Sequence, residues 1–81
     1  AQRHALWSAA LDEVDAHRQA FEAADKSFRR HEEEYRLGLV TNLDVLQALN
    51  DRLAMKKAWD DARLNARRAY WDLRAAVGSL P

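Results

Sequence analysis

The sequence predicts an all-α fold, a long antiparallel two-helix coiled-coil hairpin, and three observations support this prediction. Apolar residues recur every seven positions through the first half of the 81-residue chain. Apart from two glycines, no residue before the final Pro81 would break a helix. A turn signal, Gly38 followed by Thr41, lies near the middle. Two helices of about 35 residues joined by a few residues must run antiparallel.

The first helix is expected from about residue 2 to 37. Its large apolar residues with seven-residue spacing are Trp7, Val14, Phe21, Phe28 and Tyr35. A helix with this repeat supercoils left-handedly about a neighbour, because only then does the stripe stay buried. A second row at the same spacing consists of Ala9, Ala16 and Ala23. Small residues let another helix approach closely, so we expect contacts on more than one side of this helix.

The turn is expected at residues 38 to 41. Gly38 can take the left-handed conformation that ends a helix. Thr41 begins a capping box, in which its hydroxyl accepts a hydrogen bond from the Asp44 amide and the Asp44 carboxylate reaches back. Val40 and Val45 are placed to form a hydrophobic staple around this cap. The turn is therefore short and well specified.

The second helix is expected from about residue 42 to 77, before the helix stop at Gly78. Its large and small apolar residues are spread too widely to face one partner, which indicates a helix flanked on two sides. The large ones are Val45, Leu46, Leu49, Leu53, Met55, Trp59, Leu64, Tyr70, Leu73 and Val77, and the small ones are Ala48, Ala58, Ala62, Ala66, Ala69 and Ala76. The expected register places Phe21 near Trp59 and Trp7 near Leu73.

Composition excludes several classes of function. Lys and Arg together number 13, as do Asp and Glu, so no net charge attracts the chain to nucleic acid or to an anionic membrane. The arginines of the second helix alternate with aspartates, which favours a solvated face over a phosphate-binding track. No segment approaches the roughly 20 apolar residues of a membrane-spanning helix. A chain this short and without cysteine is expected to need a partner or self-association for stability.

No catalytic, cofactor or metal site is predicted, and the chain is not expected to be an enzyme. His31, Glu34 and Tyr35 share one side of a helix, but two-metal helical sites use Glu followed three residues later by His, and here the order is reversed. His31 is therefore interpreted as a solvated or stacking residue. His4 and His17 have no serine or cysteine partner placed for nucleophilic catalysis.

The segment from Tyr35 to Ala48, YRLGLVTNLDVLQA, resembles the periplasmic-tip motif of the TolC-like outer-membrane efflux proteins. In that motif a tyrosine is followed at steps of three by glycine, threonine or serine, and an acid, and then by an aliphatic pair and an alanine. The returning helix also resembles that family, including its Ala-x-Gly-x-Leu element at Ala76, Gly78 and Leu80. The resemblance covers roughly residues 34 to 80.

The resemblance implies a trimeric channel in the outer membrane of a Gram-negative bacterium, serving multidrug efflux or type I secretion. This segment would lie in the periplasm, as a fragment of one hairpin repeat of an α-barrel. The implied partners are a periplasmic adaptor (membrane fusion) protein, an inner-membrane pump reached through the adaptor, and two further copies of the parent protein. The fragment alone is expected to self-associate, because its flanks lack their neighbours.

The resemblance also implies two groups of site residues. The adaptor-docking tip would be Gly38, Leu39, Val40 and Thr41, and the channel aperture would be lined by Tyr35, Asp44 and Gln47. An apolar Leu39–Val40 pair at a tip favours docking, although Gly38 and Thr41 are also explained as caps. Asp44 either serves only as a helix cap, or three copies of it form a negative ring that favours cations at the channel constriction. For Tyr35, the last member of the heptad stripe, a place in the core is preferred.

Some relatives carry a second acid where this chain has Gln47, and an arginine where it has Val40. Both departures argue against a role of this hairpin in holding a gate closed by salt bridges. The alternative from another class is a stand-alone interaction module that dimerises into a four-helix bundle through the alanine rows. A stable dimer sensitive to bulky residues at Ala16 or Ala23 would favour that alternative.

Overall fold

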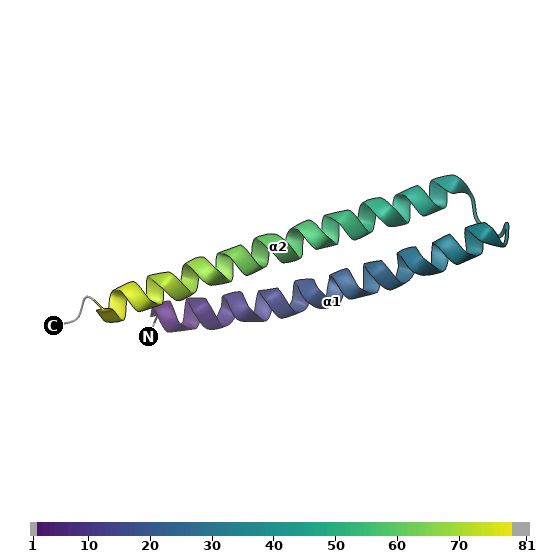
Figure 1. The fold of residues 1–81 in the computed structure, drawn as a ribbon. Helices are drawn as coiled ribbons and strands as arrows, with labels where there is room; N and C mark the ends of the chain where they lie inside the picture. The colour runs from purple at the N-terminus through teal and green to yellow at the C-terminus, as the bar shows by residue number, and fades with distance from the viewer. Residues whose placement is uncertain (1, 79–81) are drawn as a thin grey trace.

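The computed structural model describes residues 2–78, which form one extended helical hairpin (Figure 1). Helix α1 spans Gln2–Arg36 and helix α2 spans Asn42–Gly78. The described residues contain no strand, and the hairpin measures 67 × 13 × 12 Å. The predicted all-α, two-helix antiparallel fold is confirmed. Leu80, which belongs to the motif near the chain end, lies outside the described residues.

The interface between α1 and α2 is built on alanine. Among the described residues, the buried apolar positions are Ala10, Ala48, Ala62 and Ala66, each at most 7% exposed. Larger side chains such as Phe21, Phe28 and Trp59 lie half-buried beside these alanines. Small residues let the two helix backbones approach closely, so the hairpin forms a thin core without fully burying any large side chain that the structure describes.

Aromatic and charged side chains set the register of the two helices. The rings of Phe21 and Trp59 stack with centroids 5.5 Å apart, which confirms the predicted pairing. Trp7 packs against Tyr70 at 5.6 Å, one helical turn before its predicted neighbour Leu73. A tyrosine ring reaches farther along a helix than a leucine side chain does, which explains this offset.

One ion pair joins the helices near the middle of the hairpin. Arg52 Nε lies 2.7 Å from Asp25 Oδ1, and the guanidinium sits 5.3 Å from the centre of the Phe28 ring. The two charged side chains are 34% and 22% exposed, so they are partly shielded from water. The pair therefore helps to set the register of α2 against α1, and it lies at the edge of the interface beside Phe28.

The side of α2 that faces away from α1 carries a stripe of large exposed residues, here called the outer leucine face. Its members are Leu46, Leu53, Leu64 and Trp71, with exposed fractions of 46 to 59%. They are spaced by 7, 11 and 7 residues, close to whole numbers of helical turns. Because Ala62 and Ala66 each lie two residues from Leu64, about 200° around the helix, this face lies opposite the core.

A row of small residues is exposed on α1. It consists of Ala9, Ala16 and Ala23, here called the outer alanine row, and it lies on a flank of the helix, because Ala9 is next to buried Ala10 and Ala23 is next to half-buried Ala24. Each helix therefore packs one face in the hairpin and leaves further apolar residues exposed, and the flanking of α2 on two sides stays a prediction.

Candidate functional site at the hairpin tip

Helix α1 ends in a Schellman motif centred on Gly38. This glycine has a φ of 74°, in the left-handed region that side chains disfavour. The Gly38 amide donates to the Tyr35 carbonyl at 3.0 Å, and the Leu39 amide donates to the Glu34 carbonyl at 2.8 Å. These two bonds satisfy carbonyls that the helix end would otherwise leave unpaired. The chain reversal at Gly38 thus follows from local backbone chemistry.

Helix α2 begins with the predicted capping box. The Asp44 amide donates to Thr41 Oγ1 at 3.2 Å, and the Thr41 amide donates to Asp44 Oδ2 at 2.8 Å. The Thr41 hydroxyl also donates to Asp44 Oδ2, at 2.9 Å. Val40 and Val45 are both half-buried, as a hydrophobic staple across the cap requires. The first turn of α2 is therefore held by reciprocal hydrogen bonds.

The cap also changes the acidity of Asp44. The bond from the Thr41 amide, and then the bond from the Thr41 hydroxyl, hold the pKa of the Asp44 carboxyl below its ordinary value, and the nearby His31 adds to this. Asp44 is consequently a carboxylate at neutral pH. Both bonds go to Oδ2, and within residues 2–78 Oδ1 accepts no hydrogen bond. One oxygen of the charged group therefore remains available to water or to another molecule.

The tip exposes three leucines on a short stretch of chain. Leu39 is 70% exposed, Leu37 is 64% exposed and Leu43 is 62% exposed. Val40 is only half-buried, so of the two apolar tip residues expected to face outward Leu39 does so far more. Leu37 and Leu43 were not among the predicted site residues. Their signal in the sequence was a leucine directly before Gly38 and another two residues after Thr41, where no neighbouring helix covers them.

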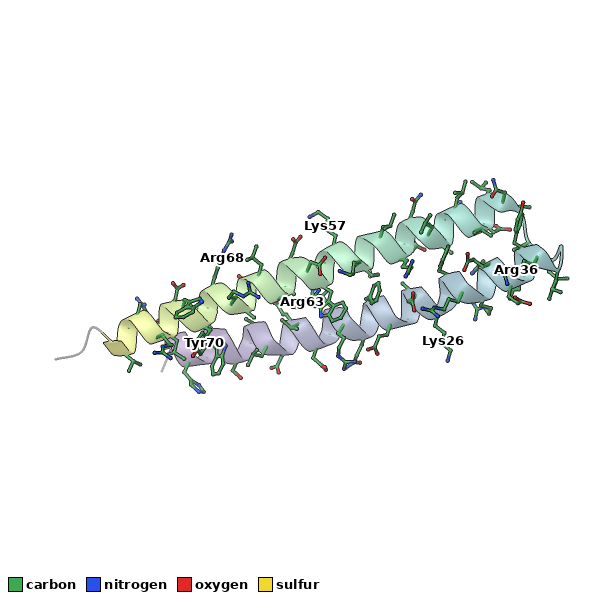
Figure 2. All side chains as sticks on the ribbon, viewed as in Figure 1. Lys26, Arg36, Lys57, Arg63, Arg68 and Tyr70 are labelled. Atoms are coloured by element: carbon green, nitrogen blue, oxygen red, sulfur yellow. The ribbon has the colours of Figure 1, made fainter. Side chains whose placement is uncertain are left out.

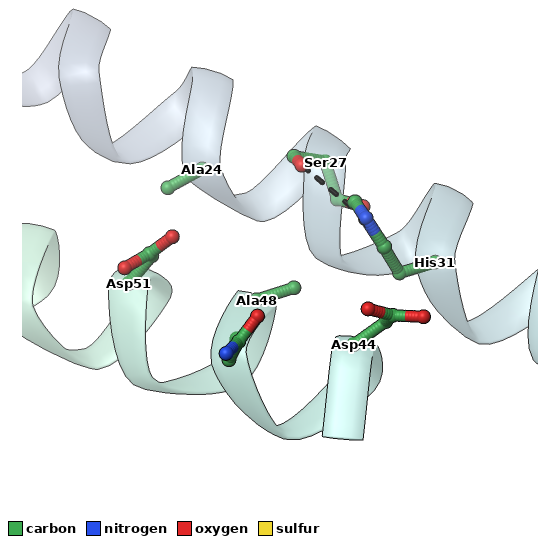
Figure 3. A pocket seen from close by; sticks show the side chains of 7 residues that line it. Ala24, Ser27, His31, Asp44, Ala48 and Asp51 are labelled. Carbon is green, nitrogen blue, oxygen red and sulfur yellow. Dashed lines mark hydrogen bonds between the residues drawn. The ribbon is translucent and has the colours of Figure 1, made fainter. Parts of the chain in front are cut away.

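The three predicted aperture residues fall in two places. Asp44 and Gln47 line an open pocket between the helices just below the tip (Figure 3), whose other lining residues are Ala24, Ser27, His31, Ala48 and Asp51. Tyr35 does not line this pocket and is 49% exposed. The preferred core role of Tyr35 is therefore wrong: the heptad stripe continues to this residue, but α2 does not cover it there.

His31 lies in this pocket with a defined orientation. Its Nδ1 is 2.8 Å from the Ser27 carbonyl oxygen (Figure 3). A carbonyl only accepts hydrogen bonds, so Nδ1 carries the proton and Nε2 is the nitrogen left to gain one. Across residues 2–78 no three His, Cys, Asp or Glu side chains are grouped so that they could hold a metal ion. The pocket is a polar notch in which His31 of α1 faces the Asp44 carboxylate of α2.

The fold and this tip define a class of protein: a long two-helix hairpin with exposed apolar side chains along α2 and at its turn. The chain matches the family model described as outer membrane efflux protein over residues 1–79, and it belongs to that family. The resemblance to TolC-like proteins is thereby confirmed. No match was found among curated proteins or among solved structures.

Membership places the chain in an outer-membrane efflux channel of Gram-negative bacteria, in a family of transport channels rather than enzymes. None of the helices in the described part of the chain is both long enough and apolar enough to cross a membrane.

Proposed function

We propose that this hairpin is a wall element of a trimeric outer-membrane channel for efflux or type I secretion, with its tip at the periplasmic end. The observation that supports this most is the family match over residues 1–79. The rod shape and the two outer apolar faces fit such a wall, because each helix then has a neighbour on both sides. Residues 1 to 81 act as a single unit of the wall. The channel conducts its substrate passively, without catalysis.

We further propose that the tip, residues 38 to 41, docks a periplasmic adaptor protein and through it an inner-membrane pump. The exposed side chain of Leu39 supports this, together with Leu37 and Leu43 beside it. Covering apolar surface gains about 25 cal/mol per Å² removed from water, so an adaptor surface that buried the three leucines would be held mainly by them. Gly38 and Thr41 hold the docking surface in place through the bonds described above.

Replacing Leu39 by aspartate tests docking. The probe is a helical-hairpin peptide from a periplasmic adaptor protein, and the measurement is its dissociation constant by titration calorimetry. We expect at least a tenfold weaker affinity, because the substitution places a charge where apolar surface is buried. The matched control is Leu6→Asp, since Leu6 is 58% exposed at the opposite end of the rod and should leave affinity unchanged. Equal affinity for Leu39→Asp and the unaltered hairpin rejects the docking role.

The aperture role is proposed for Asp44 and Gln47, which share the pocket below the tip, and for Tyr35, which is exposed outside that pocket. The carboxylate has one oxygen without a hydrogen bond from residues 2–78, and three such groups around an axis would favour cations. Asp44→Asn in the trimeric channel should lower its selectivity for cations in planar bilayers. Thr41→Ala separates the two roles of Asp44, because it removes the cap while keeping the charge. If both variants reduce selectivity equally, Asp44 acts only through the fold of the tip.

A further inference from the structure

The outer leucine face of α2 has a residue pattern that reads the same in both directions along the helix. Midway between its exposed residues Leu53 and Leu64 lie one charge of each sign, Lys57 and Asp60. With the outer members of the face, the full series is Leu46, Leu53, Lys57, Asp60, Leu64 and Trp71, at spacings of 7, 4, 3, 4 and 7 residues. A two-fold rotation brings its apolar residues onto apolar residues and its lysine onto its aspartate. The face is therefore complementary to a second copy of itself.

The whole series lies on one side of α2. At about 100° per residue, its members fall within roughly 60° of one another around the helix axis. Ala62 is buried on the side that faces α1, whereas Lys57 is exposed and projects away from α1 (Figure 2). Two further exposed residues, Asn50 and Arg67, fill the remaining gaps, so the stripe has a member at every third or fourth position. This is the spacing of a seam along which two helices supercoil.

The two central charges decide which direction a partner copy takes. When two copies lie face to face with their tips at opposite ends, Lys57 of each copy meets Asp60 of the other. When the tips lie at the same end and the same faces meet, lysine meets lysine and aspartate meets aspartate. Like charges across a helix contact repel, so the arrangement with opposed tips is favoured. Opposed helices also bring opposite ends of their macrodipoles together.

Both central groups keep hydrogen-bonding capacity for a partner. Lys57 Nζ donates to Asp61 Oδ2 at 2.9 Å on the exposed side of α2. An ammonium group has three donors, so this bond leaves donors for a second carboxylate. Asp60 accepts from Lys56 with both oxygens, each at 3.1 Å, and also pairs with Arg63. A carboxylate has about four acceptor positions, so Asp60 can accept one more hydrogen bond.

We propose that two copies of this chain bind each other through their outer leucine faces, with their tips at opposite ends. Leu53 of each copy packs on Leu64 of the other, and Leu46 of each copy packs on Trp71. The two central charges form one ion pair on each side of the two-fold axis and fix the register. At about 1.5 Å per residue, the contact extends over about 38 Å of α2.

This dimer is independent of the proposed function. In a wall whose hairpin tips share one end, two opposed hairpins have no place, so the dimer forms between chains outside such a wall. A chain whose outer leucine face is covered in the dimer cannot offer that face to a wall neighbour, so assembly requires the dimer to dissociate. The experiments use the 81-residue chain without an adaptor or a channel. The docking role can therefore fail while the dimer holds, and the reverse is equally possible.

Two variants of opposite charge test the ion pairs. Lys57→Asp leaves only negative charge at the centre of the face, and Asp60→Lys leaves only positive charge. We expect each variant alone to self-associate about tenfold more weakly than the unaltered chain in sedimentation velocity, because both symmetric pairs become like-charged. An equimolar mixture should recover the affinity to within about threefold, because each chain then meets its opposite. A mixture that associates no better than its components, with unchanged helix content in circular dichroism, overturns the proposal.

Lys26→Asp is the matched control for the change in net charge. Lys26 is exposed on α1, outside the proposed contact, so this variant should self-associate as the unaltered chain does. A loss equal to that of Lys57→Asp means that net charge alone governs association, and it overturns the assigned pairing.

Disulfide trapping tests the register without changing the charges, since the chain has no cysteine of its own. Leu53→Cys and Leu64→Cys variants are oxidised separately and as a mixture, and the products are separated on a non-reducing gel. We expect the mixed dimer to form at least about five times faster than either homodimer. In the proposed contact the two positions meet, whereas each lies about 16 Å along the axis from the same position of the other copy. A faster Leu64→Cys homodimer means aligned tips and overturns the proposal, and equal rates overturn it as well.

Discussion

The two sides of helix α2 differ: the residues that it buries fully against α1 are alanines, whereas several of its large apolar side chains stay exposed on the opposite side. Ala62 and Ala66 are 7% exposed in the interface, whereas Leu53 and Leu64 on the opposite side are 56% and 46% exposed. Large side chains gain the most free energy from leaving water. The contrast indicates that the alanines let the two helices approach closely, while part of the large apolar surface of α2 stays exposed outside the interface with α1.

The largest effect is expected from overpacking the side of α2 that faces α1. Ala62→Leu should lower the free energy of unfolding by about 2 kcal/mol, because added methylene groups force apart two backbones that meet through small residues. Urea denaturation followed by circular dichroism measures the loss. Ala54 is exposed on the same helix, so Ala54→Leu should change stability by no more than about 0.5 kcal/mol. Equal losses would mean that the inner face is not closely packed.

Next in size is the ion pair at the edge of the inner face. Arg52→Ala should cost about 1.5 kcal/mol, because it removes a partly shielded pair with Asp25 and the contact over Phe28. Lys57 pairs with Asp61 at 2.9 Å on the outer side, with side chains 78% and 63% exposed. Lys57→Ala should therefore cost about 0.3 kcal/mol in the same assay. A larger effect at Lys57 would contradict the distinction between inner and outer faces.

At the tip the large apolar side chains Leu37, Leu39 and Leu43 are exposed, and hydrogen bonds of the cap stabilise the start of α2. Thr41→Ala should destabilise the hairpin by about 1 kcal/mol, because the amide of Asp44 loses its acceptor at the start of α2. Hydrogen exchange should show faster opening of the first turn of α2. Thr41→Asn is the control, since asparagine caps helices equally well and should keep stability within a few tenths of a kcal/mol.

The same cap makes the tip acid-sensitive. The pKa of Asp44 is lowered in the folded hairpin by the Thr41 amide and hydroxyl, so its stabilising effect is complete above its ordinary pKa. The effect is lost as the pH falls through the lowered value, which is below about 4. The difference in unfolding free energy between the unaltered hairpin and Asp44→Asn should be constant near neutral pH and shrink below that point. A difference that grows on acidification would contradict this assignment.

The smallest effect is expected on the outer face itself. Leu53→Ala should change the unfolding free energy of the dilute monomer by no more than about 0.5 kcal/mol, because Leu53 is 56% exposed and buries little area within one hairpin. The measurement is urea denaturation at concentrations where sedimentation shows a monomer. A loss comparable to that of Ala62→Leu would show that the outer leucine face already stabilises the single hairpin.

The turn and the centre of the hairpin could be predicted from sequence because their signals are local or strictly periodic. Gly38 and the box formed by Thr41 and Asp44 depend on residues within three positions of one another. The stacking of Phe21 on Trp59 follows from counting away from a short turn. A short loop limits how far the two helices can shift along each other, so pairs of residues near the turn and in the middle of the hairpin can be found by counting.

Other features could not be predicted because they depend on where one element stops covering another. The heptad repeat gives the direction of Tyr35 but not the fact that α2 leaves it 49% exposed. Leu37 and Leu43 look like ordinary helix residues until the turn shows that nothing covers them. The family resemblance named the tip segment, whereas the ion pair of Arg52 with Asp25 required both helices to be placed side by side.

The slender outline of the hairpin, 67 Å long and about as wide as two helices, also has a mechanical meaning. A rod of this shape is a lever: pivoting it by about 5° at the open end would carry the tip sideways by roughly 6 Å. Side chains near Trp7 and Tyr70 need to slide only a fraction of that distance. A small rotation at the open end would therefore produce a much larger displacement at Asp44.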